Sequence, residues 1–465
     1  MKYNMKQHLS TFSLVLLITG AIDSIRNLPA TAWFGSQLIF FFIFSAIIFL
    51  IPVALVSAEL STLWTDEEPG IYGWVKKAFG KHWAFNSIWL QWVNTLVWYP
   101  TILIFISSTL AFLIFPAGTK SVSFTITCTI VIFWSQTILA LRGLHASARF
   151  AGICAILGMI LPMSFIILLG FLWPALGHPS AISFAWHDLI PQLKQQESWI
   201  SLTAIMTSFL GMELAAVHIR QVKHPQKTYP KAMFYSILLI LATMILGSLA
   251  IAMVLPKQDI NLVVGVLQTG TTFLKYHHLE FAMPLLVFLI FIGSIGSMVN
   301  WILAPAQGLA YSASDRHLPA WFAKTNDKGV PHRILLTQAG VVTVFCLSFL
   351  LLPNINAIYW FFTALSTELY MFMYVLMFFA AIRIKTKYAH IPRTFQIPGK
   401  KLGYYLTCLL GLLGCAITLY IGFFPPQEAL ALPHPEYYKF YFGTGLTLML
   451  TPALLGLAYR KIFRK

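Results

Sequence analysis

The sequence predicts an all-α polytopic membrane protein, and its composition and its apolar runs support this independently. Of the 465 residues, 58% are hydrophobic and only 10% are charged, and the mean hydropathy is +0.76. A soluble domain usually has about a quarter of its residues charged. The apolar runs are about 20 residues long, the length of a membrane-spanning helix, whereas the strands of a membrane barrel alternate over about ten residues.

Twelve apolar runs are long enough to span a membrane. Their expected bounds are 10–33, 36–62, 84–115, 121–141, 147–174, 198–219, 231–255, 279–307, 333–352, 357–382, 402–424 and 439–459. The first run lacks a small-residue cleavage site, so we expect a retained helix rather than a signal peptide. We expect one transmembrane domain over 1–460, with five-helix halves at 10–174 and 198–382, two further helices at 402–459 and a short cytoplasmic tail at 461–465.

The lysines and arginines predict the orientation of the spans. With the amino terminus inside, the inside segments hold 25 of these residues, the outside segments hold five, and Arg26 lies within the first span. This asymmetry predicts a multi-pass protein of the plasma (inner) membrane with both termini in the cytoplasm. It also accounts for the net charge of +16, so we do not expect nucleic-acid binding.

Sequence patterns of enzymes and metal sites do not occur in the chain. HExxH, Walker A and GxSxG motifs are missing from the sequence, so we expect neither an enzyme nor an ATP-driven pump. The five cysteines lie in apolar runs without a CxxC pair, which is typical of buried thiols rather than of a disulfide framework. We therefore expect no cofactor and no bound metal.

Four carboxylates lie within or at the edge of the expected spans: Asp23, Glu59, Glu213 and Glu368. Ionisable groups at membrane depth are costly, so they are functional candidates by default. Glu59 lies near the expected cytoplasmic end of span two, which favours a structural role. Glu368 either pairs with a neighbouring helix or takes part in function. Asp23 and Glu213 stand out, because each lies close after a glycine in an otherwise continuous span.

Spans one and six begin the two five-helix halves, and both carry this combination of glycine and carboxylate. The two segments are Gly20, Ala21, Ile22, Asp23 and Ser24 in span one, and Phe209, Leu210, Gly211, Met212 and Glu213 in span six. Interrupted spans at corresponding positions of two halves indicate a transporter binding site. A broken helix exposes N–H groups that suit a carboxylate and C=O groups that suit an ammonium. Together they would bind a zwitterionic amino acid.

Spans three and eight carry further polar and aromatic candidates. Those of span eight are Gly293, Ser294, Gly296, Ser297, Asn300 and Trp301, and those of span three are Gln91, Trp92, Asn94 and Trp98. Small residues at such spacings let helices approach closely. The alternative is that Ser294, Ser297 or Asn300 faces the cavity. Phe209 is either a lid over bound substrate or a packing residue.

The chain resembles the amino acid–polyamine–organocation (APC) transporters and, within them, the bacterial glutamate/γ-aminobutyrate antiporters. The resemblance covers nearly the whole chain. It rests on "IPVALVSAELSTLW" followed by "GIYGWVKKAFG" (51–80), "FLGMELAAVHIRQVKHPQKTYPKAM" (209–233), "AIAMVLPKQDINLVVGVLQT" (250–269), "PAQGLAYSASDRHLPAWFAKTNDKGVP" (305–331) and "RTFQIPGK" (393–400). These segments are specific for the family and less specific for the substrate.

The resemblance implies a 5+5 inverted repeat with broken helices 1 and 6 and two C-terminal helices. It places the site between spans one, three, six, eight and ten, and implies alternating access, commonly with one-for-one exchange. The substrate α-carboxylate would meet the backbone of 20–22, and the amino group would meet carbonyls of 209–212. Phe209 falls where relatives have a gating aromatic residue.

The chain also departs from the antiporters that it resembles. Ser297 falls where they have an acidic residue on span eight, and span five has only Arg149, near the membrane edge, where some relatives have a lysine. We expect no counterpart, after the last span, of the carboxy-terminal segment that plugs their cytoplasmic path, and therefore no acid gating by such a plug. Asp23 and Arg26, three residues apart, are expected to face each other or polar neighbours along one side of the broken helix. We expect them either to stabilise the break or to contact the substrate side chain.

Three functional hypotheses follow from these residues. The first is an amino-acid exchanger in a lipid bilayer, with gating or coupling candidates Asp23, Arg26, Glu213, Ser294, Trp301 and Glu368. The second is a proton- or Na⁺-coupled symporter of amino acids or polyamines, in which Glu213 or Asp23 titrates and Ser294 or Ser297 binds a cation. The third is an amino-acid sensor with this fold that binds its ligand but does not transport it.

Overall fold

The computed structural model describes residues 9–65, 68–115, 121–191, 202–348, 355–424 and 435–463, with the backbone alone at 144–149, 300, 355–358, 435 and 454–463. In this part the chain is helical, and one isolated β-bridge joins Leu9 to Val222. Ten of the helical stretches are long and apolar enough to cross a membrane. The two remaining expected spans correspond to the apolar helices α16 (His332–Ser348) and α19 (Tyr438–Phe463). The prediction of an all-α polytopic membrane protein is confirmed.

The helices follow the order of the expected spans. Up to residue 175 they are α1 (Thr11–Ile22), η1 (Ile25–Asn27), α2 (Leu28–Ala32), η2 (Gly35–Gln37), α3 (Leu38–Ser45), η3 (Ala46–Leu50), α4 (Ile51–Leu63), α5 (Gly70–Phe79), α6 (Lys81–Ile114), α7 (Val122–Leu141), α8 (Leu144–Ala155), η5 (Ile156–Ile160) and α9 (Leu161–Ala175). The longer helices after that point are α12 (Leu202–Thr207), η6 (Met212–Gln221), α13 (Pro225–Val254), α14 (Gly265–Tyr276), α15 (Met283–Ser314), α16, α17 (Ile355–Lys387), α18 (Lys400–Ile421) and α19.

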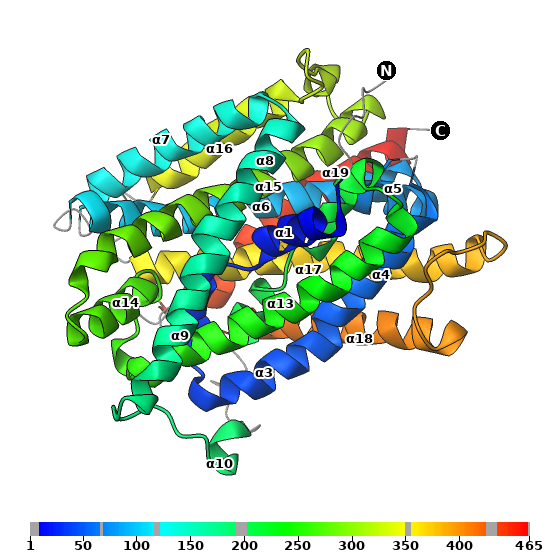
Figure 1. Cartoon of the computed structure of the whole chain (residues 1–465). Coiled ribbons are helices and arrows are strands. Elements are labelled where there is room, and N and C mark those ends of the chain that lie inside the picture. Colours follow the sequence, from blue (N-terminus) through cyan, green and yellow to red (C-terminus); the bar gives the residue numbers. More distant parts are fainter. Residues whose placement is uncertain are drawn as a thin grey trace.

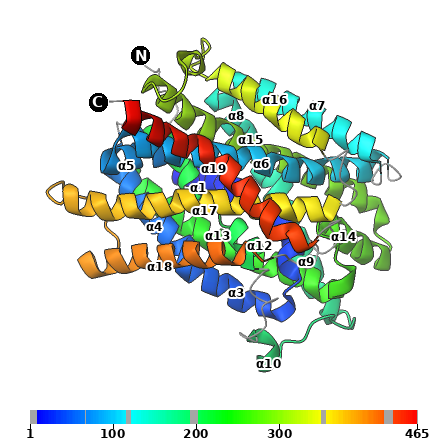
Figure 2. The ribbon, with the colours of Figure 1, turned by 180° about the vertical axis from the view of Figure 1, so that it is seen from behind.

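The long helices run side by side, and α6, α15 and α17 form the middle of the molecule (Figures 1 and 2). Helix α6 packs against both α15 and α17, α13 packs against α9, and α1 packs against α13. The pair α7 and α16 lies at one edge, and α18 lies beside α17 toward the opposite edge. The two described ends of the chain lie at the same end of the helix bundle (Figure 1).

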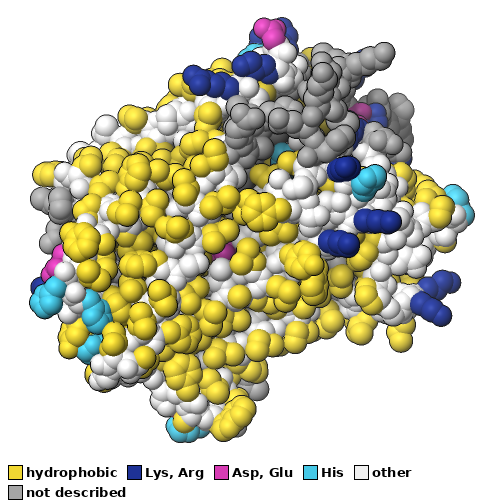
Figure 3. Space-filling model, viewed as in Figure 1, with side chains coloured by type: hydrophobic (Ala, Val, Ile, Leu, Met, Phe, Trp, Pro, Cys, Tyr) yellow, Lys and Arg dark blue, Asp and Glu magenta, His cyan; other side chains and the backbone are white. Residues whose placement is uncertain are grey.

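The outer surface is apolar where lipid would cover it. Figure 3 shows hydrophobic side chains across the middle of one face, while lysine and arginine side chains gather mainly at the end of the bundle near the two chain ends. Exposed large hydrophobic side chains are numerous, among them Leu238, Leu285 and Leu409. Such a surface is unfavourable in water and favourable in hydrocarbon, so the structure describes a multi-pass membrane protein.

The first span is broken where the sequence predicts it. Helix α1 ends at Ile22, and Asp23 and Ser24 are extended, with ψ angles of 124° and 115°. The chain resumes a helical course at Ile25, and Pro29 lies in the first turn of α2. Proline is tolerated there because the N–H groups of a first turn have no partner within the helix. Asp23 and Ser24 also compete for backbone hydrogen bonds, which favours the break.

The sixth span is broken at 208–211. Helix α12 ends at Thr207, a turn follows, and η6 begins at Met212. Gly211 has a φ of +105°, a conformation that residues with a Cβ rarely adopt. A Cβ at Gly211 would also lie 2.8 Å from the Trp301 ring. The glycine is therefore required twice, by the backbone angle and by the neighbouring side chain.

Span eight uses its glycines for close packing. A Cβ at Gly293 would overlap the carbonyl oxygen of Gly158, and a Cβ at Gly296 would overlap Cys154. Gly158 lies in η5, a π-helical stretch that Pro162 follows by two residues. Proline removes one helix hydrogen bond, and a π-helical turn is a common local adjustment inside a helix. The close-approach interpretation of these glycines is confirmed.

Glu59 on α4 has a structural environment. Its carboxylate accepts hydrogen bonds from Lys385 Nζ at 2.9 Å, from the Arg393 guanidinium, and from the backbone N–H of Ile397 at 2.9 Å. The carboxylate is fully buried. Lys385 lies in the last turn of α17, and Arg393 lies in the connection between α17 and α18. These contacts agree with the structural role expected for Glu59, because they bind this connection to α4.

Candidate functional site

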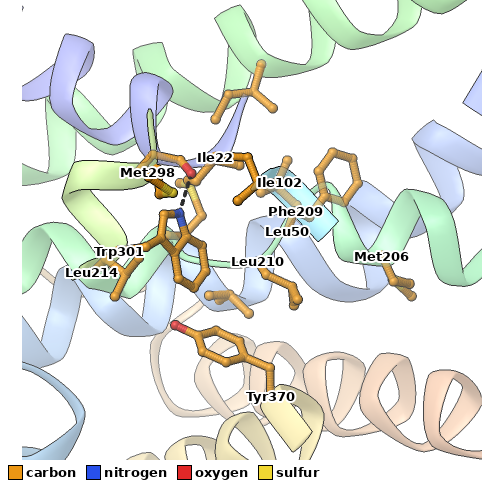
Figure 4. Close-up of a cluster of buried hydrophobic side chains, with 14 of the residues drawn as sticks. Ile22, Leu50, Ile102, Met206, Phe209, Leu210, Leu214, Met298, Trp301 and Tyr370 are labelled. Carbon is orange, nitrogen blue, oxygen red and sulfur yellow. Dashed lines mark hydrogen bonds between the residues drawn. The ribbon is translucent and has the colours of Figure 1, made fainter. Parts of the chain in front are cut away.

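Trp301 on α15 contacts both broken spans. Its indole Nε1 donates a 2.8 Å hydrogen bond to the carbonyl oxygen of Ala21, in the last turn of α1, and its ring edge lies against Gly211. In Figure 4 the ring lies between Ile22 and Met298 on one side and Tyr370 on the other. The backbone carbonyl of Trp301 accepts a 2.8 Å hydrogen bond from Tyr99. Trp301 is therefore the residue that joins the two breaks.

Both breaks leave backbone groups without partners in the part of the chain that the structure describes. In span six the carbonyl oxygens of Ser208, Phe209 and Leu210 accept no hydrogen bond. In span one the N–H groups of Ser24, Ile25 and Arg26 donate none. The N–H of Asp23 is used, because it donates to Thr19. Free groups of this kind are the expected consequence of ending one helix and starting another inside a span.

Glu213 lies at the start of η6, and side chains of two other spans bind its carboxylate. Gln91 Nε2 on α6 donates to Oε1 at 2.9 Å, Tyr370 on α17 donates to the same oxygen, and Tyr374 donates to Oε2 at 2.5 Å. Tyr374 also accepts a 2.9 Å hydrogen bond from the N–H of Gly211. The carboxylate is thus joined to the break itself, and it is 1% exposed.

Tyr370 and Tyr374 were not predicted from the sequence, whereas Glu213 and Gln91 were. The two tyrosines are four residues apart on α17, so both hydroxyls reach the same side of the helix. That spacing, in the span that also holds Glu368, is the signal that could have identified them. Their rings contact each other at a centroid distance of 5.1 Å, and Tyr370 contacts Trp301 at 5.6 Å.

Asp23 and Arg26 do not pair with each other. Thr243 Oγ1 on α13 donates to Asp23 Oδ2 at 2.6 Å, and Asp23 Oδ1 has no partner among the described residues. Arg26 Nη1 donates to Thr101 Oγ1 on α6 at 2.7 Å, and Nε has no described partner. Of the two arrangements expected from their spacing, contact with polar neighbours is found and mutual contact is not.

Two aromatic rings lie close to the Arg26 guanidinium. Its central carbon lies 5.4 Å from the ring centroid of Trp98 and 5.6 Å from that of Tyr359. Trp98 in turn contacts Trp301 at a centroid distance of 5.2 Å. A continuous set of aromatic contacts therefore leads from Arg26, through Trp98 and Trp301, to Tyr370 beside Glu213.

The remaining expected residues have other environments. Phe209 is fully buried, with its ring 5.7 Å from that of Phe42. Ser294 donates to Ile290 of its own helix, and Ser297 is half-buried on α15. The side chain of Asn300 lies outside the described residues. Span eight thus contributes Trp301 to the described site.

Glu368 and the deeper amides of span three lie on α17 and α6. Glu368 is fully buried against Gly422 at the end of α18, and its oxygens have no described hydrogen-bond partner. Asn94 Nδ2 donates to Ser366 Oγ at 2.8 Å, and Trp92 Nε1 donates to Gln338 Oε1 at 2.9 Å. In the described residues, no three His, Cys, Asp or Glu side chains come together in a way that could hold a metal ion.

The site is nearly closed on the side of α5. A cavity of about 20 Å³ extends from Glu213 and Gln91 to Tyr72 and Tyr311, which is room for about one water molecule. Beyond it, Asp315 at the end of α15 binds Tyr72 at 2.6 Å, Lys76 at 2.6 Å and Lys81 at 2.7 Å. These bonds connect α5 and the start of α6 to α15. Desolvation raises the pKa of Asp315, but the combined hydrogen bonds from these three residues outweigh it and lower that pKa below its usual value.

Comparison with known proteins gives the family. The amino acid permease family model matches residues 9–447. An uncharacterized transporter of Legionella pneumophila is 39% identical over 91% of both chains. A glutamate/γ-aminobutyrate antiporter of Lactococcus lactis is 26% identical over 91% of this chain and 85% of its own length, and a probable agmatine/putrescine antiporter of the same species is 23% identical over 85% and 84%. The chain belongs to the amino acid permease family of APC transporters.

Proposed function

We propose that this protein exchanges amino acids across the plasma membrane by alternating access, with its substrate between the breaks of spans one and six. The observation that carries the proposal is the pair of breaks that Trp301 contacts, which in the described residues offer unpaired carbonyls in span six and unpaired N–H groups in span one. A zwitterion needs both kinds of partner. Membership of the amino acid permease family supports transport of amino acids or polyamines.

The directions of the broken helices suggest how the substrate lies. The carbonyls of 208–210 would bind the amino group, a segment that overlaps the carbonyls of 209–212 implied by the family resemblance. The N–H groups of 24–26 would bind the α-carboxylate. This position for the α-carboxylate differs from the backbone of 20–22 that the resemblance implied. Residues 20–22 belong to the last turn of α1, where a helix has free carbonyl groups rather than free N–H groups, so the N–H groups just after them are the better partners.

The described conformation fits a closed intermediate of the cycle. Trp301 donates a hydrogen bond to the Ala21 carbonyl oxygen, so this oxygen is not free to bind substrate. The cavity that leads from Glu213 toward α5 is also too small for an amino acid. Opening toward the α5 side would require Asp315 to release Tyr72, Lys76 and Lys81. We propose that the halves 10–174 and 198–382 form the inverted repeat and that both termini face the cytoplasm, which places α5 on the cytoplasmic side.

Ion-coupled symport is the second candidate function. It is favoured by buried carboxyl groups that have no cationic partner among the described residues, namely Asp23, Glu213 and Glu368. A carboxyl group in such an environment can carry a proton through the cycle. Exchange remains the proposal, because an antiporter is among the relatives that cover 91% of the chain.

Proteoliposomes containing the purified protein separate these functions. For exchange, uptake of a labelled amino acid is expected only when the vesicles are preloaded with unlabelled amino acid. Uptake into empty vesicles driven by an imposed proton or Na⁺ gradient would favour symport, and binding without flux would favour a sensor. Gly211→Ala should abolish flux, while Gly340→Ala is the matched control, since a Cβ at Gly340 meets no other atom within 4 Å.

A further inference from the structure

Arg26 is a buried cation without an anionic partner in the described part of the chain. It is 2% exposed, and its one hydrogen-bond acceptor is the neutral hydroxyl of Thr101. Its Nε has no partner, although a guanidinium carries five N–H donors. A buried charge without a counter-charge is strongly unfavourable, so the fold keeps it only where something else compensates.

Several other cations of this protein are paired with carboxylates. Arg393, whose side chain is 5% exposed, binds the carboxylate of Glu59, and Lys76 and Lys81 bind Asp315. The nearest acidic residue to Arg26 in the sequence, Asp23, is instead bound to Thr243 on α13. Arg393 is paired with a carboxylate of the protein, whereas Arg26 is not paired with any carboxylate of the described residues. We therefore look for the anionic partner of Arg26 outside the protein, in a ligand.

Arg26 lies next to the proposed binding position of the substrate α-carboxylate, at the N–H groups of 24–26. Its backbone N–H is one of the three unpaired donors after the first break. Its guanidinium reaches between α6 and α17, where it lies near the rings of Trp98 and Tyr359. Aromatic rings stabilise a guanidinium through its charge but do not accept its in-plane hydrogen bonds as a carboxylate does. The unused N–H donors therefore remain available to an anionic ligand.

We propose that the Arg26 guanidinium binds a carboxylate on the side chain of the substrate, in addition to the α-carboxylate bound elsewhere. The substrate class is then acidic amino acids in their anionic form. This inference rests on the proposed function. The bound α-carboxylate would lie at the backbone N–H groups, and the side-chain carboxylate would lie against the guanidinium. A planar guanidinium can bind a carboxylate through two parallel hydrogen bonds, which neither an amide nor an amine can reproduce. The same charge disfavours diamines such as putrescine.

The test compares L-glutamate with L-glutamine, which has the same shape and no side-chain charge. Counterflow in proteoliposomes at pH 7.5 is measured for the full chain, for Arg26→Gln and for Arg26→Lys, with putrescine as a third competitor. The wild type is expected to have a KM for glutamate at least tenfold lower than for glutamine. Arg26→Gln should remove this preference by raising the KM for glutamate, and Arg26→Lys should keep part of it.

The control is Arg383→Gln. Arg383 is exposed and lies over the Phe79 ring at 5.2 Å, so this change also removes an arginine from an aromatic face. It should leave the preference unchanged. The inference is overturned if the wild type transports glutamine as well as glutamate, or if Arg26→Gln keeps the preference or slows both substrates equally. Absence of counterflow by the wild type with any amino acid would instead overturn the proposed function. If Arg26→Gln does not fold, the wild-type ratio and Arg26→Lys still decide the question.

Discussion

The indole Nε1 of Trp301 and the carbonyl oxygen of Ala21 are joined by a 2.8 Å hydrogen bond across the first break. Ala21 is in the last turn of α1, whose carbonyls have no partner within the helix. Trp301 therefore supplies a donor that the broken helix lacks, and its ring edge meets Gly211 in the second break. One side chain thus stabilises both breaks, and its release is a natural step in opening the site.

We expect Trp301→Phe to keep the ring contact and lose the hydrogen bond to Ala21. The loss should lower stability by about 0.5–1.5 kcal/mol, whereas Trp301→Ala also creates a cavity and should cost about 3–5 kcal/mol. Thermal unfolding in detergent measures both changes. In proteoliposomes Trp301→Phe should release preloaded substrate without exchange, because the closed conformation is weakened. Tightly coupled exchange by Trp301→Phe would show that the hydrogen bond does not hold the site closed.

We expect Tyr374→Phe to impair transport more than Tyr370→Phe. Both hydroxyls donate to the Glu213 carboxylate. That of Tyr370 also accepts from Gln91 Nε2, which keeps its bond to Glu213, whereas that of Tyr374 accepts from the backbone N–H of Gly211. A hydrogen bond to a charged group contributes about 1.5–3 kcal/mol, and Tyr374→Phe additionally leaves the buried N–H of Gly211 without its acceptor. Unfolding temperature and counterflow rate measure the effects.

Tyr404→Phe is the matched control for these two tyrosines. Its hydroxyl is buried and donates to the backbone carbonyl of Ala381 at 2.9 Å, away from Glu213. It should reduce stability by an amount typical of a neutral hydrogen bond, about 1 kcal/mol, with little change in substrate KM. Equal effects of all three changes on KM would rule out a specific role of the Glu213 contacts.

The local features of the site were predictable from the sequence, but its contacts were not. The segment from Gly20 to Pro29 contains the residues that end one helix and begin another, so the break could be read directly. Glu213 was identified for the same reason. The partners Thr243, Tyr370 and Tyr374 come from spans far away in the sequence, and the apolar pattern of a span surrounded by other helices does not reveal which neighbour each face meets.

Span eight illustrates the same limit. Its series of small and polar residues was compatible with close packing and with a polar cavity face. The structure assigns Gly293 and Gly296 to packing and gives Trp301 contacts at the breaks. The cost of adding a methyl group depends on the distance to a backbone on α8 or η5, which a single sequence does not give.

We expect Gly293→Ala and Gly340→Ala to change stability in opposite directions. Both glycines lie in apolar helices, where alanine is ordinarily favoured by about 0.5–1 kcal/mol. A Cβ at Gly293 would overlap the backbone of Gly158, whereas a Cβ at Gly340 meets nothing within 4 Å. Gly293→Ala should therefore separate α15 from η5 and lower the unfolding temperature. Equal unfolding temperatures for the two variants would contradict the close approach.

We expect the bonds of Asp315 to make stability depend on acidic pH. The pKa of Asp315 is lower in the folded protein than the ordinary value of about 3.9 for an unfolded chain. A group of this kind contributes its full stabilisation above the unfolded pKa, and the contribution is lost as the pH falls through and below that value. Asp315→Asn should therefore be less stable than the wild type at pH 7 and at pH 5. The difference should shrink below about pH 4.

Unfolding temperatures in detergent between pH 7 and pH 3 test this expectation. Asp327→Asn is the control, because Asp327 is an exposed carboxylate in the connection between α15 and α16. Its stability should follow that of the wild type across the range. A gap between Asp315→Asn and the wild type that stays constant down to pH 3 would mean that Asp315 acts through its shape rather than its charge. Closing of the gap would place the ionised Asp315, with Lys76 and Lys81, among the forces that hold α5 against α15.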